Sequence, residues 1–389
     1  MTLSSQPAYA PARKMPAKTR VSEPRRGRPK SSRARRGRVN AKPISGHPFS
    51  ALAAGIKRDV DTRLEALFEA RVASAASIGS EFAEIVVALR DLCLRGGKRL
   101  RPALLIAGYR AASSRANLEP AIDAGVALEL LQAYFLIHDD WMDGDTVRRG
   151  GPAVHALLGK RFRSVAMGDR AGILAGDYAA ALAAEAIASL DVPAARLQRV
   201  FPAFSRMQLD VVAGQQLDLV GRTRDIEKVY TLKTSSYTVK GPLTIGAMLA
   251  GGPPRVLTTL ERWAHPIGIA FQLRDDLIGT FGDVKQTGKP VGSDLRTAKR
   301  TVLLTTAMKR ARGRDHRILM GVVGKERASE NRVKQAVEVI ERCGARRVVE
   351  TRIDELVAEA QQALDAGRLS LDGKALLEGA AHVLTARVR

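Results

Sequence analysis

The chain has 389 residues, is 45% hydrophobic and carries a formal net charge of +23. It exceeds the usual domain size of about 100–150 residues, but one large domain with a tail accounts for the length. No stretch reaches the roughly 18 consecutive apolar residues that a membrane span needs, and Cys93 and Cys343 are too few and too far apart for a disulfide framework. These features predict a protein without a membrane span, in a reducing cytoplasm.

Residues 1–48 differ from the rest of the chain. They hold 13 Lys and Arg against a single acid, Glu23, and seven of the 17 prolines. Such a segment buries too little apolar surface to offset its ordering entropy, so we expect a disordered tail before a domain over 49–389. The run Pro24-Arg25-Arg26-Gly27-Arg28-Pro29-Lys30 resembles an AT-hook and suggests weak nucleic-acid binding. A solvated tail and an organelle transit peptide are the alternatives.

From residue 49 onward, Ala- and Leu-rich segments place apolar residues at helical spacing between short Gly and Pro breaks. No strand pair and no repeat stands out. The pattern predicts an all-α fold, a single large antiparallel helical bundle. The expected helices are 52–95, 102–115, 119–143, 171–189, 193–219, 225–251, 256–281, 299–313, 328–343, 347–366 and 371–388.

The first chemical signal is the basic turn Gly96-Gly97-Lys98-Arg99-Leu100-Arg101-Pro102. Two glycines end one helix, and a proline favours the start of the next. A helix N-terminus surrounded by cations is a ready anion site. The turn is therefore a candidate diphosphate site.

The second signal is acidic. Asp139 and Asp143 lie four residues apart on one helix face, with Asp140 beside them, at the end of an apolar helix. Crowded carboxylates need a cation, and hard oxygen ligands suit magnesium. Taken alone, the motif could also be a solvated acidic helix end.

A matching acidic pair, Asp275-Asp276, also follows an apolar run. Basic residues follow both acidic sites and offer donors to phosphate oxygens. They are Arg148 and Arg149 after the first site, Lys289 and Lys299 after the second, and Lys233-Thr234 between the two. Each alone could be a solvated surface charge, but together they indicate a metal-diphosphate box.

Over residues 90–305 the chain resembles the trans-isoprenyl diphosphate synthases. The motifs GGKRLRP, DDWMD, RRGGP, KT, GQQLD, FQLRDD and TGKP stand in that family's order. The resemblance implies a helical bundle with a central catalytic cavity. It also implies a magnesium-dependent short-chain prenyltransferase that condenses isopentenyl diphosphate with allylic diphosphates to farnesyl or geranylgeranyl diphosphate, and a homodimer.

The resemblance also implies roles for individual residues. Several magnesium ions would bind Asp139, Asp140, Asp143, Asp275 and Asp276, and Asp294 would assist them through water. The allylic diphosphate would bind Arg148, Lys233, Lys289 and Lys299, and isopentenyl diphosphate would bind Lys98, Arg101, Gln132 and Arg149. Thr234 and Gln272 would line the reaction centre, where Asp139, Asp140, Lys233 and Asp275 also act.

Two positions bear on specificity. Gly279 stands where many members of the family carry a third aspartate, which puts the third metal in question. Tyr134 and Phe135 precede Asp139 by about one turn, where large side chains in the family stop elongation. Two rings favour a fifteen-carbon product, and the overall motif style also resembles twenty-carbon synthases.

Two other functions fit part of the pattern. A class I terpene cyclase also ionises an allylic diphosphate at an aspartate-rich site, but it would lack the second diphosphate site at Lys98 and Arg101. A non-catalytic partner subunit of a synthase would keep the fold, but retention of all five aspartates argues against it.

Overall fold

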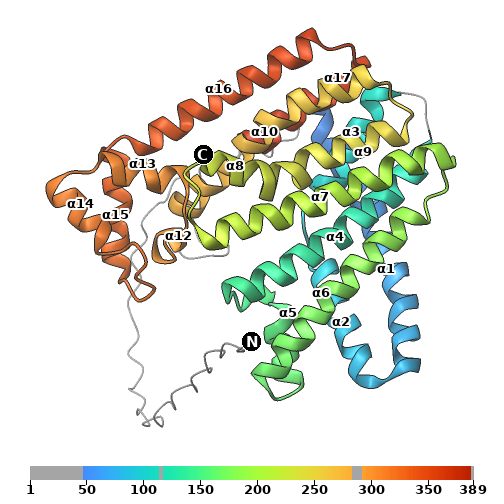
Figure 1. Ribbon diagram of the computed structural model, residues 1–389, viewed down its shortest axis with the longest axis horizontal. Helices are drawn as coiled ribbons and strands as arrows, with labels where there is room; N and C mark the ends of the chain where they lie inside the picture. The colour runs from blue at the N-terminus through green and yellow to red at the C-terminus, as the bar shows by residue number, and fades with distance from the viewer. Residues whose placement is uncertain (1–46, 114–116, 283–290, 387–389) are drawn as a thin grey trace, which may run out of the picture. The chain divides into compact units, whose positions relative to one another are not determined.

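The computed structural model describes residues 47–113, 117–282 and 291–386, all within one compact unit, Ile44–Arg389. The described part is helical apart from one two-residue strand pair, so the predicted all-α bundle is confirmed (Figure 1). Residues 1–46 of the predicted tail (1–48) and the TGKP motif with Lys289 lie outside the described residues, and the first helix begins at Pro48.

The elements follow one another in antiparallel fashion in much of the bundle (Figure 1). In chain order they are α1 (Pro48–Ile78), α2 (Ser80–Leu94), α3 (Leu100–Ala112), α4 (Glu119–Asp143), β1 (Val147–Arg148), β2 (Gly151–Pro152), α5 (Val154–Arg161), α6 (Val165–Ala188), α7 (Ala194–Val220), α8 (Ile226–Tyr230), the π-helix η1 (Thr231–Lys240), α9 (Gly241–Leu249), α10 (Pro254–Phe281), α12 (Ser293–Arg296), α13 (Val302–Arg310), α14 (Gly313–Met320), α15 (Glu330–Arg342), α16 (Ala345–Ala366) and α17 (Leu371–Thr385).

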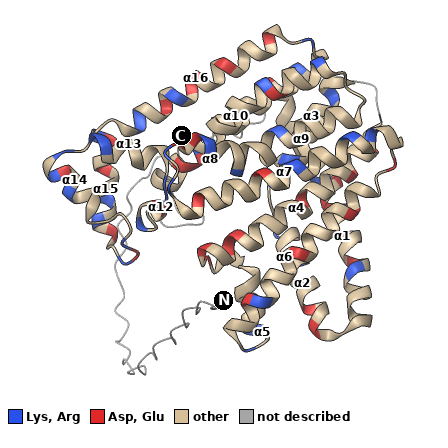
Figure 2. Ribbon diagram, viewed as in Figure 1, with Lys and Arg blue, Asp and Glu red and all other residues tan. Residues whose placement is uncertain are grey.

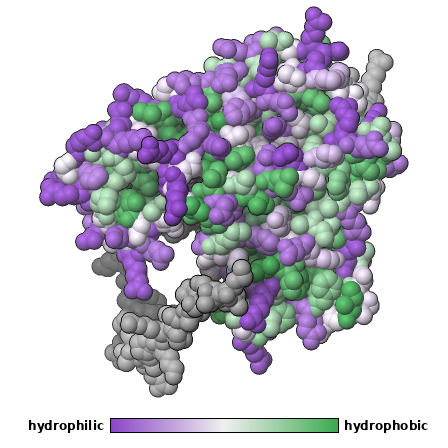
Figure 3. Space-filling view, viewed as in Figure 1, coloured by the Kyte–Doolittle hydropathy of each residue, from purple (hydrophilic) through white to green (hydrophobic). Residues whose placement is uncertain are grey.

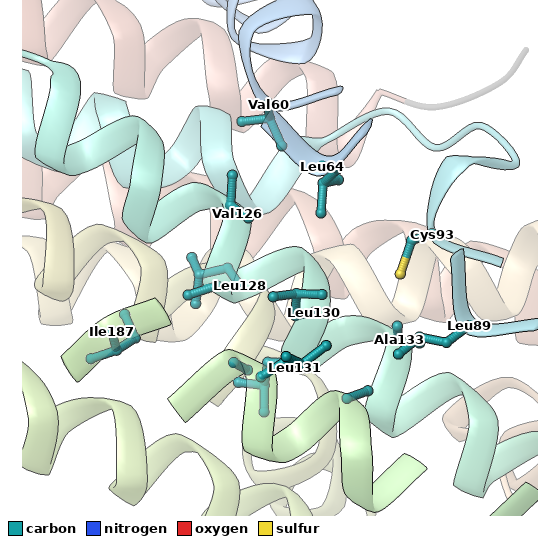
Figure 4. Close-up of a cluster of buried hydrophobic side chains, with 14 of the residues drawn as sticks. Val60, Leu64, Leu89, Cys93, Val126, Leu128, Leu130, Leu131, Ala133 and Ile187 are labelled. Atoms are coloured by element: carbon teal, nitrogen blue, oxygen red, sulfur yellow. The ribbon is translucent and has the colours of Figure 1, made fainter. Parts of the chain in front are cut away.

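Helix α4 forms the centre of the largest core cluster. Its apolar residues meet Val60 and Leu64 of α1, Leu89 of α2 and Ile187 of α6 (Figure 4). Helix α6 approaches α4 closely because Gly176 faces His138, where any β-carbon would overlap the imidazole ring. This packing holds the C-terminal end of α4, which carries the first acidic motif, in a fixed position.

The bounds of several elements differ from those expected. The segment 52–95 breaks at Gly79 into α1 and α2, since the extended backbone of Gly79 interrupts the helix. The segment 225–251 contains the π-helix η1 between two α-helices. The short helices α5 and α14 and the strand pair were not expected, because elements this short carry little periodic signal.

Helices α4 and α6 are both long and apolar enough to cross a membrane by length and composition alone. The α4 segment is mostly buried inside the bundle, as in the core helix of a soluble protein. Helix α6 buries one side and exposes the other, which carries Val165, Met167 and Leu174. Cys93 and Cys343 are both free thiols, in agreement with the sequence.

Candidate active site

The first acidic motif occupies the last turn of α4, which ends at Gly144 in the left-handed conformation. Asp140 is buried and accepts a hydrogen bond from Arg148 Nε at 2.7 Å. Arg148 Nη2 also lies 3.9 Å from Asp139 Oδ2. Burial raises the pKa of Asp140, and Arg148 opposes that rise. The Arg148 guanidinium thus partly neutralises the neighbouring carboxylates of Asp139 and Asp140, which would otherwise repel each other.

Lys233 of η1 faces this motif. Its Nζ lies 3.3 Å from Asp139 Oδ1 and 2.7 Å from Asp218 Oδ2 at the end of α7. Burial favours a lower pKa for Lys233, but Asp139 and Asp218 outweigh it and raise the pKa. Lys233 therefore stays charged between two helices. Gly214 permits this approach, since a β-carbon there would overlap the backbone of Lys233.

The second acidic motif lies on α10. Asp276 is buried and accepts hydrogen bonds from Gln272 Nε2 at 2.9 Å and from the Tyr230 hydroxyl. Thr234 Oγ1 donates to Gln272 Oε1 at 2.7 Å, which links η1 to the same carboxylate. Burial raises the pKa of Asp276 to about 6.

Lys299 is the cation of this second motif. Its Nζ lies 3.7 Å from Asp276 Oδ1 and 4.0 Å from Asp294 Oδ2. Asp218 and Asp275 also contribute to the negative field at Lys299. Since Asp218 acts on both Lys233 and Lys299, the two acidic motifs face a common centre.

The Asp294 carboxylate occupies the space beside Gly279. A β-carbon on Gly279 would lie 2.6 Å from Asp294 Oδ2. A third aspartate at position 279 would therefore collide with Asp294. In this chain the third carboxylate at the second motif comes from α12.

The basic site consists of two turns with several cations, residues 96–102 and the turn between β1 and β2. Arg95 Nη1 donates to the carbonyls of Arg148 (3.1 Å) and Pro152 (2.9 Å), and Arg149 Nη1 donates to the carbonyl of Leu92 at 3.2 Å. These bonds join the Gly96-Gly97 turn to the strand pair β1–β2. Arg149 has a positive φ of 51°, a conformation that these contacts stabilise.

The buried member of the basic turn is Arg99, which pairs with Glu129 at 2.5 Å and Asp61 at 2.7 Å and so has a structural role. Lys98 is exposed. Arg101 lies 4.4 Å from the Tyr237 ring centroid and donates to Thr238 Oγ1 at 2.8 Å.

Among the buried polar atoms without a hydrogen-bond partner are Arg101 Nε in the basic turn and Gln132 Oε1 on α4. Buried polar groups are normally paired, so Arg101 Nε is a donor available to an anionic ligand, whereas Gln132 Oε1 can only accept a hydrogen bond. This geometry fits an anion-binding subsite next to the acidic one.

A cavity of about 170 Å³ extends from Asp139 and Lys233 between α4, α7 and η1. Tyr134 and Phe135 line it with Tyr237, and the rings of Phe135 and Tyr237 pack edge to face at 5.0 Å. Its remaining walls are largely apolar, including Met142, Val211, Val212 and Leu219. The cavity is thus charged at one end and hydrophobic at the other.

The first motif brings Asp139, Asp140 and Asp143 together with Arg148 and Lys233, and the second brings Asp275 and Asp276 together with Thr234, Gln272 and Lys299. Lys98, Arg101, Gln132 and Arg149 are not part of these two groups, and Lys289 lies outside the described residues. The roles predicted for these residues stay predictions.

Two participants were not expected. Asp218 could have been found from the sequence, because it is the last residue of the GQQLD motif. Tyr237 follows Lys233 by four residues and lies between the cavity and Arg101. The spacing of these residues in the sequence does not reveal where the Tyr237 ring lies.

The donor set fits magnesium. Within the described residues, no three carboxylate, imidazole or thiol groups are arranged to hold a metal on their own. Magnesium does not need such a cage, because it takes one or two carboxylates and completes its shell with water and substrate phosphates. Asp140 Oδ2 is buried without a hydrogen-bond partner, as an oxygen reserved for a cation would be.

Residues 83–340 match the family model described as polyprenyl synthetase. The chain is 32% identical to the geranylgeranyl diphosphate synthase of Methanosarcina mazei, over 78% of this chain and 90% of that one. It is 34% identical to the (2E,6E)-farnesyl diphosphate synthase of Mycobacterium tuberculosis, over 64% and 68%.

A solved structure agrees with these matches. Geranylgeranyl pyrophosphate synthase from Corynebacterium glutamicum, in complex with isoprenyl diphosphate and magnesium, is 35% identical, with a TM-score of 0.81 over 87% of this chain and 99% of that one. The family and fold expected from the sequence are thereby confirmed. The chain belongs to the polyprenyl synthetase family, whose enzymes make isoprenyl diphosphates.

Proposed function

We propose that this enzyme joins isopentenyl diphosphate to an allylic diphosphate and makes a short-chain product, farnesyl or geranylgeranyl diphosphate. The relatives described above carry these activities in their names. The observation that supports it most strongly is Lys233, whose ammonium lies between Asp139 of α4 and Asp218 of α7, at the mouth of an apolar cavity.

In this proposal the allylic diphosphate lies between the two acidic motifs. Asp139, Asp140 and Asp143 would hold magnesium from α4, and Asp275 and Asp276 would hold it from α10. Asp294 would support the second motif. When bound, magnesium supplies positive charge that stabilises the departing diphosphate. Arg148, Lys233, Lys289 and Lys299 are the proposed contacts to its oxygens.

Isopentenyl diphosphate would occupy the basic site. Lys98, Arg101 and Arg149 supply its cations, and Gln132 supplies a polar side chain at the wall. The unpaired Arg101 Nε supports this assignment. Because Tyr237 contacts both Arg101 and Phe135, the two substrates would meet beside its ring.

The chain's residues then act by position and charge. Lys233 and Arg148 stabilise the diphosphate as the allylic carbon–oxygen bond ionises. Thr234 and Gln272, joined by a hydrogen bond, fix the wall beside the cation that forms. The double bond of isopentenyl diphosphate attacks that cation, and the proton lost afterwards passes to the released diphosphate.

Tyr134 and Phe135 are proposed to limit chain length. Both line the apolar part of the cavity, and their ring centroids lie 4.9 Å apart. A growing chain would enter between α4 and α7 and stop at these rings. We propose the fifteen-carbon product, with the twenty-carbon product as the alternative.

A homodimer is part of the proposal. Helix α7 exposes Phe201, Leu209, Val212 and Leu219, and apolar side chains gather across the middle of the face on which α7 lies (Figure 3). Leu174 is exposed on α6. A second copy would bury this surface. A cytoplasmic location and weak nucleic-acid binding by residues 1–48 are also proposed, from composition alone.

The test is a product assay. Purified protein with magnesium and isopentenyl diphosphate is given dimethylallyl, geranyl or farnesyl diphosphate in turn, and the products are dephosphorylated and separated by chromatography. The proposal predicts elongation of at least one primer. Absence of elongation with all three would refute it.

A further inference from the structure

The segment 309–335 concentrates positive charge outside the motifs described above. It holds nine Lys and Arg against three acids, a net charge of +6 in 27 residues. Residues 49–389 together carry only +11. Figure 2 shows basic residues on α14 and α15, and Lys309 and Arg310 form the C-terminal end of α13. More than half of the net charge of this domain therefore lies on one small part of it.

Three of these cations surround one cavity. Arg314 and Arg317 lie one turn apart on α14, and Arg332 lies on α15. With Ile318, Gly321 and Gln335 they line a space of about 420 Å³. The two helices are held together by buried Leu319, Val333 and Ala336, so the arginines stand on a packed base.

No carboxylate lines this cavity. Within the described part of the chain, Arg314, Arg317 and Arg332 form no ion pair within 4.0 Å. The nearest acid in sequence, Asp315, is bound by Arg342 through Nη2 at 2.5 Å and Nε at 3.0 Å. Asp315 also attracts Arg314, from beyond ion-pair distance. Since no carboxylate lines the cavity itself, three like charges face one space, an arrangement that a bound anion relieves.

The geometry suits a phosphate-bearing ligand. Guanidinium groups offer paired N–H donors that match phosphate oxygens, and the Gln335 amide adds a neutral donor. The cavity volume falls within the range of about 300–1,000 Å³ typical of small-molecule sites. None of its residues lines the cavity at Asp139 and Lys233.

We propose that the cavity between α14 and α15 is a second anion site, separate from the active site, that binds a phosphate or diphosphate group. Two sources supply this chemistry, a free phosphorylated metabolite and the head group of an anionic lipid. The experiment below separates them.

The test compares the full-length protein with the variant R314Q/R317Q/R332Q. A matched control, R58Q/R262Q/R347Q, removes the same charge from exposed arginines outside both cavities. Calorimetric titration with inorganic pyrophosphate counts the binding sites per chain, and steady-state kinetics with prenyl substrates follows the active site. Sedimentation with phosphatidylglycerol vesicles, against phosphatidylcholine vesicles, measures lipid binding.

If the ligand is a free anion, the parent and the control should bind pyrophosphate at one more site per chain than R314Q/R317Q/R332Q. If the ligand is a lipid head group, they should bind phosphatidylglycerol vesicles at least about tenfold more tightly than the variant. A tenfold difference corresponds to the loss of about one charge-assisted contact in the variant. If the variant loses the extra pyrophosphate site, the ligand is a free anion. If it loses only vesicle binding, the ligand is a lipid head group. Prenyl transfer stays unchanged in all three proteins. Equal pyrophosphate stoichiometry and equal vesicle binding in parent and variant would overturn the proposal.

Discussion

Asp294 Oδ2 lies where a side chain on Gly279 would have to begin, 2.6 Å from the position of its β-carbon. Gly279→Ala must therefore displace Asp294, which lies 4.0 Å from Lys299 Nζ. We expect a loss of about 1–3 kcal/mol in the free energy of unfolding. A higher magnesium concentration at half-maximal activity should accompany it. Urea denaturation and a magnesium titration measure the two effects.

Gly55→Ala is the matched control for this change. Gly55 is also helical, in α1, but a β-carbon there meets nothing within 4 Å. The same substitution should stabilise the protein by about 0.5–1 kcal/mol, since alanine favours a helix interior over glycine. Equal effects at both positions would show that Asp294 does not constrain position 279.

Stability should depend on pH through Asp276. Its pKa is about 6 in the folded protein, above the ordinary aspartate value of 3.8, because the carboxyl is buried. Below pH 3.8 the carboxyl is protonated in both states. Between about pH 4 and 6 the unfolded chain releases the proton first, so this group lowers stability as pH rises, by about 3 kcal/mol in full above pH 6.

Asp276→Asn removes that dependence. In magnesium-free buffer, the free energy of unfolding of the variant relative to the parent should increase by about 3 kcal/mol from pH 4 to pH 7. The attraction of Lys299 acts only on the ionised carboxylate and is already contained in the folded pKa of Asp276. A constant difference for Asp276→Asn would mean that the folded carboxyl titrates normally.

Chain length should respond to the rings in the apolar cavity. Tyr134→Ala and Phe135→Ala each remove a ring that lines it, and the product should lengthen by at least one five-carbon unit. Chromatography of the dephosphorylated products measures the change. Phe82→Ala, which removes an aromatic residue packed on Tyr178 outside the cavity, should leave product length unchanged. Unaltered products from both cavity variants would refute the assigned stop.

Lys233→Met should lower kcat by on the order of 10²–10³, because it removes the cation between Asp139 and Asp218 that is proposed to stabilise the departing diphosphate. Lys228→Met changes an exposed lysine five residues earlier and should leave kcat unaltered. Steady-state kinetics at saturating substrate distinguishes the two. A normal kcat in Lys233→Met would remove this residue from the proposed mechanism.

The proposed dimer should depend on the exposed face of α7. Leu209→Glu with Val212→Glu places two charges on that face, and the protein should become monomeric in light scattering after gel filtration. Leu371→Glu introduces a charge at another exposed apolar position and should leave the mass unchanged. A monomeric parent protein would contradict the dimer directly.

Much of the fold follows from local patterns. Long periodic segments predict α4, α7, α10 and α16, and the two aspartate motifs lie at the ends of apolar runs as expected. The sequence analysis missed the break at Gly79, which depends on a single residue, and the helix α14, which has only eight residues. Short elements depend on tertiary packing more than on periodicity.

Contacts between distant segments explain the rest. Gly214 and Gly268 allow α7 and α10 to touch the backbone of η1, where β-carbons would overlap Lys233 and Ser235. Asp294 reaches Gly279 from another element. Nothing in the spacing of one sequence reveals which small residue faces which helix. The candidate catalytic groups and the facing of the two aspartate motifs could be predicted from the sequence, but the contacts that bring the helices together could not.

The winding of η1 determines where its side chains point. In an α-helix, residues five apart diverge by about 140° around the axis, because each residue turns by about 100°. A π-helix bonds each residue to the fifth along, so such residues lie on the same side of the helix. Lys233 and Thr238 are related in this way: one contacts Asp139, and the other accepts a hydrogen bond from Arg101. A single wide coil thus faces both the first acidic motif and the basic turn, and rewinding it as an α-helix would rotate one of the two side chains away from its partner.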